Sequence, residues 1–598
     1  MDTLTFLGLF EATSHISPLC QDQRFSVINT IPAYRGIKAQ AHERQVFIMK
    51  LTASLSIISV LVAICSAAPQ IKIGSTTLNG RDIPTLRQEF FGGIPYAEPP
   101  LGDLRLRPPV LKTVLDSETF DASDYGPGCL QKASGTAPLS EDCLTINILR
   151  PSGLPEDAKL PVFFWVYGGG FEAGVSSIYN GSAIVAQSVA RGTPLIYVNF
   201  NYRLGPLGFP QGQEADDKKA LNLAIKDEIA ALEWIQSNIG IFGGDKEKVT
   251  VFGESAGAIM NSILFLNSPL EKLARGAILE SGSQATSLNS FASRREIDWQ
   301  NFVSGVASCA SLATSGHTFD CLQNAPSDEI LNGLVNAINE AQEQFAFDPT
   351  IDGPDGLYPD LPSRVFAQGN FAKIPFISGT NLDEGTAFTP LTINSEDQIR
   401  AAIISNLTPP FVPEYEVLRA ADKLLELYPD IPALGCPFNT GNETFGLSSQ
   451  FKRAAALNGD ISFHSQRRFF QSTATKAGIK NWGYSFTQPQ PGLPPFIGVT
   501  HGVEVPYVFG APSDQSASSL RISALMIDYW VSFATSLDPN DGKGLPRPVW
   551  EQYAIGDESV MQLNGDDTKM IPDTFRKEQI DFINSIPVVL MHRRNDKI

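Results

Sequence analysis

The sequence predicts an α/β protein built on one large, mostly parallel sheet that is flanked by helices. Three observations predict it: short apolar runs typical of buried strands, a helical apolar pattern between two of them, and a glycine-rich turn that joins a strand to a helix. Strands that alternate with helices favour a parallel sheet covered on both faces. In such sheets ligands bind beyond the carboxyl ends of the strands.

Each expected element follows from its own pattern. Ile225 to Ile239 repeats isoleucine or leucine at three- and four-residue steps before Gly240, which predicts a helix. Ile522 to Leu537 predicts another, stopped by Asp538-Pro539. Residues of about 290–370 and 390–480 are less regular and predict helical insertions above the sheet. The expected buried strands are Val162 to Tyr167, Leu195 to Phe200, Val249 to Phe252, Ala277 to Leu279 and Ile374 to Ile377.

The overall charge argues against nucleic acid and anionic lipid as partners. The chain has 598 residues and a formal charge of −19, and such a surface repels nucleic acid and anionic lipid. Acidity also keeps an exported protein soluble, so it does not identify the substrate. We expect a single folded domain over residues 70–590.

The N-terminal region predicts export. After Met49-Lys50, the stretch Leu51 to Ile64 is apolar or small, and Cys65-Ser66-Ala67 follows. This run is shorter than the roughly 20 residues that span a membrane, so it predicts a signal peptide at 49–67, a secreted protein and no stable membrane insertion. Residues 1–48 are then expected to be a non-native extension or disordered. The alternative is a signal-anchor with a short cytoplasmic tail.

Export permits disulfides and glycans. Local pairing of cysteines favours two short loops and leaves Cys436 single. The cysteine spacings match no zinc site, so we expect no metal. The expected pairs are Cys129 with Cys143 and Cys309 with Cys321, and the sequons are at Asn180, Asn406 and Asn442.

The strongest chemical signal is Gly253-Glu254-Ser255-Ala256-Gly257, placed between the strand that ends at Phe252 and a helical pattern. A tight strand-to-helix turn needs glycines on both sides of the serine, and it leaves the serine hydroxyl exposed. A plain glycine-rich turn is the alternative. The context favours Ser255 as a nucleophile.

A serine nucleophile needs a base, which points to histidine. Of the six histidines, His501 stands beside Gly502 in a loop-like segment, whereas His464 follows Asp460-Ile461-Ser462-Phe463 in a helical pattern. Loop context favours His501 as the base. His464 is then a structural histidine.

The orienting acid is expected between serine and histidine in the chain. Asp383 and Glu384 follow the predicted strand Ile374 to Ile377, so they lie at its carboxyl end. Because the two are adjacent, chain geometry does not choose between them. Gly168-Gly169-Gly170 follows another strand and offers unobstructed backbone N–H groups for an oxyanion.

Together these segments resemble the type-B carboxylesterase and lipase family of α/β-hydrolase fold, which includes cholinesterases and fungal lipases. The resemblance runs from about Phe90 to Tyr553 and includes Phe91 to Pro100, Ser140 to Leu144, Asn201 to Gly205 and Phe242 to Asp245. It implies Glu384 as the acid and both cysteine pairs. It also implies an oxyanion hole of Gly169, Gly170 and Ala256, and ester hydrolysis through an acyl-enzyme without cofactor.

Departures from the family pattern narrow the range of expected substrates. The loop from Leu130 to Asp142 lacks the tryptophan that binds choline in cholinesterase-like members. With 13 residues, it is also shorter than the lid of the lipases. We therefore expect an esterase for short- to medium-chain esters, with a true lipase or a sterol or aromatic-acid esterase as the alternative. A non-catalytic adhesion protein is disfavoured because all three triad residues are present.

Overall fold

The computed structural model describes residues 68–132, 137–287, 290–341, 344–405 and 412–590. The expected extension 1–48, the expected signal peptide 49–67 and the sequon at Asn406 lie outside these residues. The chain divides into a unit of residues 1–68 and a unit of residues 69–598. Every element described below belongs to the second unit.

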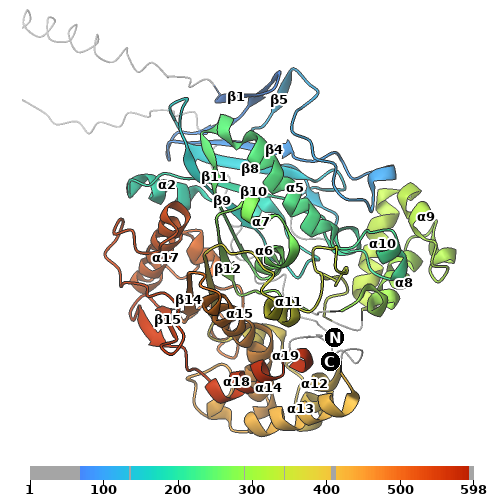
Figure 1. Cartoon of the computed structure of the whole chain (residues 1–598), viewed down its shortest axis with the longest axis vertical. Helices are drawn as coiled ribbons and strands as arrows, with labels where there is room; N and C mark the ends of the chain where they lie inside the picture. The colour runs from blue at the N-terminus through green and yellow to red at the C-terminus, as the bar shows by residue number, and fades with distance from the viewer. Residues whose placement is uncertain (1–67, 133–136, 288–289, 342–343, 406–411, 591–598) are drawn as a thin grey trace, which may run out of the picture. The chain divides into compact units, whose positions relative to one another are not determined.

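An eleven-stranded sheet forms the centre of this unit (Figure 1). Its inner strands run parallel, and antiparallel pairs close both edges. The α/β prediction of a large, mostly parallel sheet is therefore confirmed. In sheet order the strands are β16 (Lys569–Pro572), β15 (Ser559–Leu563), β14 (Asn481–Phe486), β13 (Phe376–Asn381), β12 (Gly276–Glu280), β11 (Gly244–Glu254), β9 (Leu160–Val166), β10 (Ile196–Phe200), β8 (Thr145–Pro151), β4 (Gln88–Pro95) and β3 (Arg81–Ile83).

The five predicted strands are β9 to β13, neighbours in the sheet. Three of the predicted helices are also found, as α5 (Leu223–Asn238), α6 (Ala256–Asn267) and α17 (Ala517–Ser536). The last begins earlier than predicted because the Ser516 side chain caps it by accepting from the Ser519 N–H. The apolar pattern missed this first turn, because the turn and its capping serine contain few apolar residues at helical spacing.

The helices that cover the sheet come from distant parts of the chain. Helices α2 (Ser182–Ala190) and α17 pack together, while α6 packs on β9, β11 and β12. Helix α15 (Ser465–Lys476) packs on β13 and β14. The predicted insertion at 390–480 therefore ends before α15, which belongs to the sheet's cover.

The remaining helices are short or lie in the insertions (Figure 1). They are α3 (Gly205–Gly208), α4 (Gln213–Asp217), α7 (Leu270–Leu273), α8 (Glu296–Ser304), α9 (Phe319–Asn324), α10 (Ser327–Glu340), α11 (Pro362–Gln368), α12 (Glu396–Ser405), α13 (Glu414–Leu427), α14 (Ser449–Gly459), α16 (Val505–Val508), α18 (Lys577–Ser585) and α19 (Pro587–Leu590). None of the described helices is long and apolar enough to cross a membrane.

Two small sheets and two disulfides fix the outer loops. The small sheets are β1 (Gln70–Ile73) with β2 (Thr76–Asn79) and β5 (Thr119–Asp121), and β6 (Gly128–Cys129) with β7 (Leu139–Ser140). Both expected disulfides are present, with Cα atoms 5.1 Å apart in Cys129–Cys143 and 5.8 Å apart in Cys309–Cys321. Cys436 is a buried free thiol.

Candidate active site

Ser255 lies at the turn between β11 and α6 in a conformation that side chains rarely adopt, with φ 53° and ψ −124°. Tight packing imposes this turn. A Cβ on Gly257 would lie 2.0 Å from the Val166 carbonyl oxygen, and one on Gly282 would lie 2.7 Å from the Ser255 carbonyl oxygen. Such strain is typical of a serine held out from the end of a strand.

Glu384 and His501 contact each other at the same edge of the sheet. Glu384 follows β13, and its Oε2 lies 2.7 Å from His501 Nδ1. Its Oε1 accepts from the Asn381 N–H at 2.7 Å and from the Ser281 hydroxyl at 2.6 Å. Glu384 is thus held in place by two donors besides its contact with His501.

Asp383 has a different set of partners. One of its oxygens accepts from the Phe438 N–H and the other from the Val499 N–H, both at 2.8 Å, and the Cys436 thiol donates to it at 3.3 Å. Asp383 therefore fixes two loops and does not contact His501.

The other ring nitrogen of His501 faces the serine turn. Its Nε2 lies 3.2 Å from Oε1 of Glu254, the residue before Ser255. Within the described residues this nitrogen has no hydrogen-bond partner, so the structure shows His501 beside the turn but not bonded to the serine hydroxyl. When His501 is neutral with its proton on Nδ1 toward Glu384, Nε2 is the nitrogen that can accept a proton.

Carboxylates dominate the electrostatics around His501. Burial lowers the pKa of His501, but the charges of Glu254 and Glu384 outweigh it and raise the pKa to about 9. Burial raises the pKa of Glu254 to about 8, and burial with the charge of Glu384 raises that of Glu504 to about 7. Glu504 accepts from the Asn381 side-chain amide.

Two aromatic rings enclose the imidazole. The Phe463 and Phe388 ring centroids lie 4.8 Å and 4.9 Å from that of His501. Phe463 belongs to a π-helical turn, η11 (Asp460–His464), that interrupts the run from α14 to α15. Such turns are frequent at functional sites.

His464, the alternative base, is also buried but belongs to a different environment. Its Nδ1 lies 3.1 Å from the Thr380 hydroxyl. Burial and the charges of Arg576, Arg467 and Arg468 lower the pKa of His464 well below its usual value. It does not contact Ser255.

The glycine run lies beside the serine turn. A Cβ on Gly168 would lie 2.9 Å from Ser255 Cβ, and Gly169 and Gly170 have φ of +115° and +63°. Among the described residues no backbone acceptor pairs with the N–H of Gly169 or Gly170. Ala256 is the first residue of α6, where N–H groups lack intrahelical acceptors. These three N–H groups suit a developing oxyanion.

Several residues of the site gave no sequence signal. Phe345 lies far along the chain, yet its ring packs on Gly170 so closely that a Cβ there would meet it at 2.1 Å. Glu172 and Glu504 are ordinary acids in the sequence. In the sequence, Glu172 lies close to the glycine run and Glu504 lies close to His501. This closeness is the signal that could have found them.

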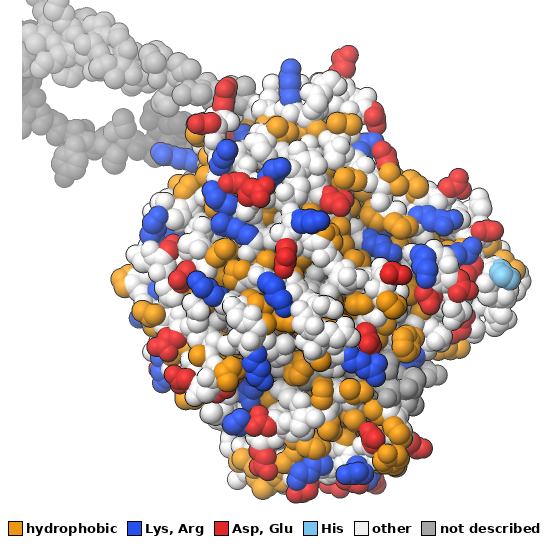
Figure 2. Space-filling view, viewed as in Figure 1, with side chains coloured by type: hydrophobic (Ala, Val, Ile, Leu, Met, Phe, Trp, Pro, Cys, Tyr) orange, Lys and Arg blue, Asp and Glu red, His pale blue; other side chains and the backbone are white. Residues whose placement is uncertain are grey.

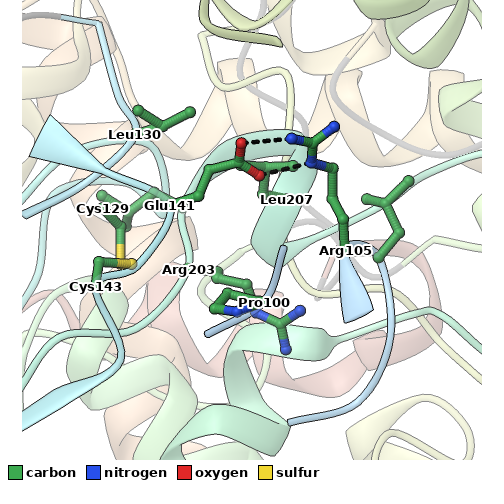
Figure 3. A pocket seen from close by; sticks show the side chains of 10 residues that line it. Pro100, Arg105, Cys129, Leu130, Glu141, Cys143, Arg203 and Leu207 are labelled. Carbon is green, nitrogen blue, oxygen red and sulfur yellow. Dashed lines mark hydrogen bonds and ion pairs between the residues drawn. A yellow bond between two sulfur atoms is a disulfide. The ribbon is translucent and has the colours of Figure 1, made fainter. Parts of the chain in front are cut away.

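The stem of the Cys129–Cys143 loop is fixed by an ion pair (Figure 3). The Arg105 guanidinium holds the Glu141 carboxylate through two contacts of 2.7 Å, beside a small cavity lined by the disulfide and Leu207. Arg105 also donates to the Ala325 carbonyl at 2.7 Å. On the other side of the loop, the Lys132 ammonium group donates to the side-chain oxygen of Asn339 at 2.9 Å.

The exposed sequons are compatible with modification. Asn180 and Asn442 both have exposed side chains, and the Asn180 side-chain oxygen accepts from the Ser182 N–H at 3.0 Å. Among the described residues no group of three or more His, Cys, Asp or Glu could hold a metal ion.

Comparison with known proteins gives one consistent result. Residues 67–583 match the carboxylesterase family. Lipase 2 of Geotrichum candidum is 34% identical, covering 82% of this chain and 91% of the relative. Secreted lipase 1 of Botryotinia fuckeliana (strain B05.10) is 33% identical, covering 87% and 93%.

Solved structures of esterases share the fold. EstA of Aspergillus niger aligns with a TM-score of 0.75 and 26% identity over 88% of this chain and 99% of that one. A PNB esterase aligns with a TM-score of 0.69 and 27% identity over 86% and 99%. Two disulfides and relatives named as secreted fit an extracellular protein. The chain therefore belongs to the carboxylesterase family and is a carboxylic ester hydrolase of the α/β-hydrolase fold.

Proposed function

We propose that this hydrolase cleaves short- to medium-chain esters through Ser255 as nucleophile, His501 as base and Glu384 as the acid that orients the base. One observation carries the proposal: Glu384 contacts His501 Nδ1 at 2.7 Å in a buried position, while the other ring nitrogen of His501 faces Glu254 in the serine turn. A hydroxyl becomes an effective nucleophile when such a base takes its proton.

The proposed steps follow from the positions of these groups. His501 Nε2 takes the Ser255 proton while the serine oxygen attacks the ester carbonyl carbon, and the carbonyl oxygen gains negative charge. The N–H groups of Gly169, Gly170 and Ala256 would hold that charge. His501 then gives the proton to the leaving alcohol, and water repeats the sequence on the acyl-enzyme. Glu384 stabilises the imidazolium in both stages.

Two features support a preference for short acyl chains. The described stems of the Cys129–Cys143 loop are tied to neighbouring segments by Glu141 and Lys132, which disfavours a large moving flap. The Phe345 ring also limits the space beside Gly170. Rates should therefore follow simple saturation with dissolved substrate.

A true lipase is the second candidate, because several relatives are named as lipases. A lipase closed by a lid gains activity when an apolar interface stabilises its open state. Initial rates across the solubility limit of tributyrin, with p-nitrophenyl acetate through palmitate as a second series, separate the two. No jump at the limit supports the esterase, whereas a sharp rise or a preference for palmitate supports the lipase.

The secretion signal and glycans complete the proposal. We expect the mature chain to begin near Ala68 or Pro69, after cleavage at small residues, and Asn180 and Asn442 to carry glycans. N-terminal sequencing of the secreted protein and peptide mass spectrometry before and after glycosidase treatment test both. Residues 1–48 on the mature chain would contradict the expected processing.

A further inference from the structure

Glu172, two residues after Gly170, links the glycine run to a distant segment. Its side chain is only 9% exposed. Its Oε1 accepts from the Ala346 N–H at 2.6 Å and from the Phe347 N–H at 3.2 Å, 174 and 175 residues further along the chain. Removing a buried acceptor leaves its donors unpaired, and here two backbone N–H groups share that acceptor. Glu172 therefore holds the main chain of residues 345–348.

Arg295 holds the same segment from another side. Its guanidinium donates to the Phe345 carbonyl at 2.9 Å and pairs with the Asp348 carboxylate at 3.1 Å. Gln211 donates to the Asp348 carbonyl at 2.9 Å. With its main chain fixed, this segment directs the half-buried Phe345 ring onto Gly170.

The position of that ring matters because of how an ester must lie. In the proposed mechanism the carbonyl oxygen points to the N–H of Gly170, and the leaving oxygen must face His501 to receive its proton. The acyl chain then leaves the carbonyl carbon on the side away from His501. The Phe345 ring packs on Gly170, so an acyl chain that runs past the Gly170 N–H meets that ring.

We propose that Glu172 is a positioning residue that keeps the Phe345 ring on Gly170 and so sets the acyl-chain length that the site accepts. This inference rests on the proposed function. Glu172 acts through Phe345 and through the glycine run that carries it, since its own N–H donates to the Gly169 carbonyl at 3.3 Å. Loss of the carboxylate frees the ring and loosens the Gly170 N–H together.

The chain supplies a matched control in Glu214 of α4. Glu214 is likewise 9% exposed and accepts from two successive backbone N–H groups, those of Thr318 at 2.6 Å and Phe319 at 3.2 Å. These belong to the start of α9, and none of the contacts of Glu214 reaches the serine turn. Glu214→Ala therefore removes an equivalent buried anchor that serves folding alone.

The test is a double-mutant cycle of Glu172→Ala and Phe345→Ala, with Glu172→Gln and Glu214→Ala beside it. For each protein, kcat and KM are measured on p-nitrophenyl butyrate and decanoate, together with the thermal midpoint. We expect Glu172→Ala to lower kcat/KM on butyrate by about 10- to 100-fold, as misplaced site groups do. We expect the butyrate-to-decanoate ratio to fall by about tenfold, the scale of a reshaped apolar pocket.

The cycle distinguishes positioning from general loosening. Glu172→Gln should keep the ratio, because its amide oxygen still accepts both N–H groups. Phe345→Ala should lower the butyrate-to-decanoate ratio by a similar factor. The double variant should lower it no further than either single variant does. Additive effects, an unchanged ratio in Glu172→Ala, or an equal change in Glu214→Ala would overturn the inference. An active Ser255→Ala protein would instead overturn the proposed function.

Discussion

Two buried histidines lie near the carboxyl end of β13 in opposite surroundings. His501 contacts the carboxylates of Glu384 at 2.7 Å and Glu254 at 3.2 Å. His464 lies among the guanidinium groups of Arg576, Arg467 and Arg468, with Asp573 only partly offsetting them. The pKa of His501 is raised to about 9, whereas that of His464 is lowered well below its usual value.

This difference shows that burial alone does not decide what a histidine does. Burial disfavours the charged form of both rings, and the sign of the neighbouring charges decides the outcome. A catalytic base must exist as imidazolium during the reaction, which needs a carboxylate partner. His501 has one, and His464 has Thr380 and positive charges instead.

The largest expected effect comes from removing the base or the nucleophile. Ser255→Ala and His501→Ala should each lower kcat by a factor on the order of 10⁶, as in serine hydrolases generally. His464→Ala should leave kcat within a few fold of the wild type, provided that the folded fraction is measured and corrected for. Steady-state kinetics on p-nitrophenyl butyrate decide this, and residual activity above a few per cent in Ser255→Ala would remove it from its role.

The two adjacent acids extend the comparison. Glu384→Gln should lower kcat by about 10⁴, because the amide cannot hold the imidazolium. Asp383→Asn should retain most activity. It should lower the free energy of unfolding by about 1–3 kcal/mol, because the amide nitrogen replaces one of the two oxygens that accept from backbone N–H groups. The measurements are kcat and urea unfolding midpoints. The reverse ranking in kcat would move the orienting role to Asp383.

Five of the eleven strands, β9 to β13, could be predicted, because buried parallel strands are continuous apolar runs. The edge strands β3 and β16 could not, since they are only three and four residues long. The buried parallel strand β14 could not either, because Asn481, Gly483 and Ser485 interrupt its apolar residues. The cover helix α15 lies in a region expected to be an insertion because polar residues interrupt its apolar pattern, and its two arginines are buried on Asp573. Buried ion pairs leave no hydrophobic pattern.

The site was predictable only where chemistry leaves a local motif. The glycines around Ser255 and the glycine run at 168–170 are local, so the sequence located them. The choice between Asp383 and Glu384 depends on contacts across the fold, and residue patterns alone left it open. Phe345 and Glu172 contribute through packing between segments 174 residues apart or more, which no single-sequence pattern records.

A smaller effect should appear when the carboxylate environment of His501 is weakened. Glu254→Gln removes a negative charge 3.2 Å from Nε2 that raises the pKa of His501. In the proposed mechanism the neutral form of His501 is the active one, so the acid limb of kcat/KM against pH should shift by about one pH unit toward lower pH. Glu247→Gln, at an exposed acid on the same strand, should leave the limb in place. An alkaline shift in Glu254→Gln would contradict this account of the site.

The smallest expected effect concerns stability, and here the two histidines act in separate pH ranges. The pKa of His464 is lower in the folded state than in the unfolded chain, so its contribution is present above the unfolded pKa of about 6.5 and is lost as pH falls below it. The pKa of His501 is raised. Its contribution is therefore present below about 6.5 and is lost as pH rises toward about 9.

Replacing His464 should accordingly flatten the stability profile on the acid side alone. Below pH 6.5 the wild type should lose about 1.4 kcal/mol per pH unit more than His464→Gln, the cost of one proton bound only by the unfolded chain. Urea unfolding midpoints between pH 5 and 8 measure this, and only the difference in slope counts, because other carboxyl groups titrate equally in both proteins. Above pH 6.5 the two slopes should agree, since His501 is present in both. Equal slopes below pH 6.5 would mean that His464 takes up a proton inside the folded protein, and the contrast between the two histidines would then rest on geometry rather than on charge.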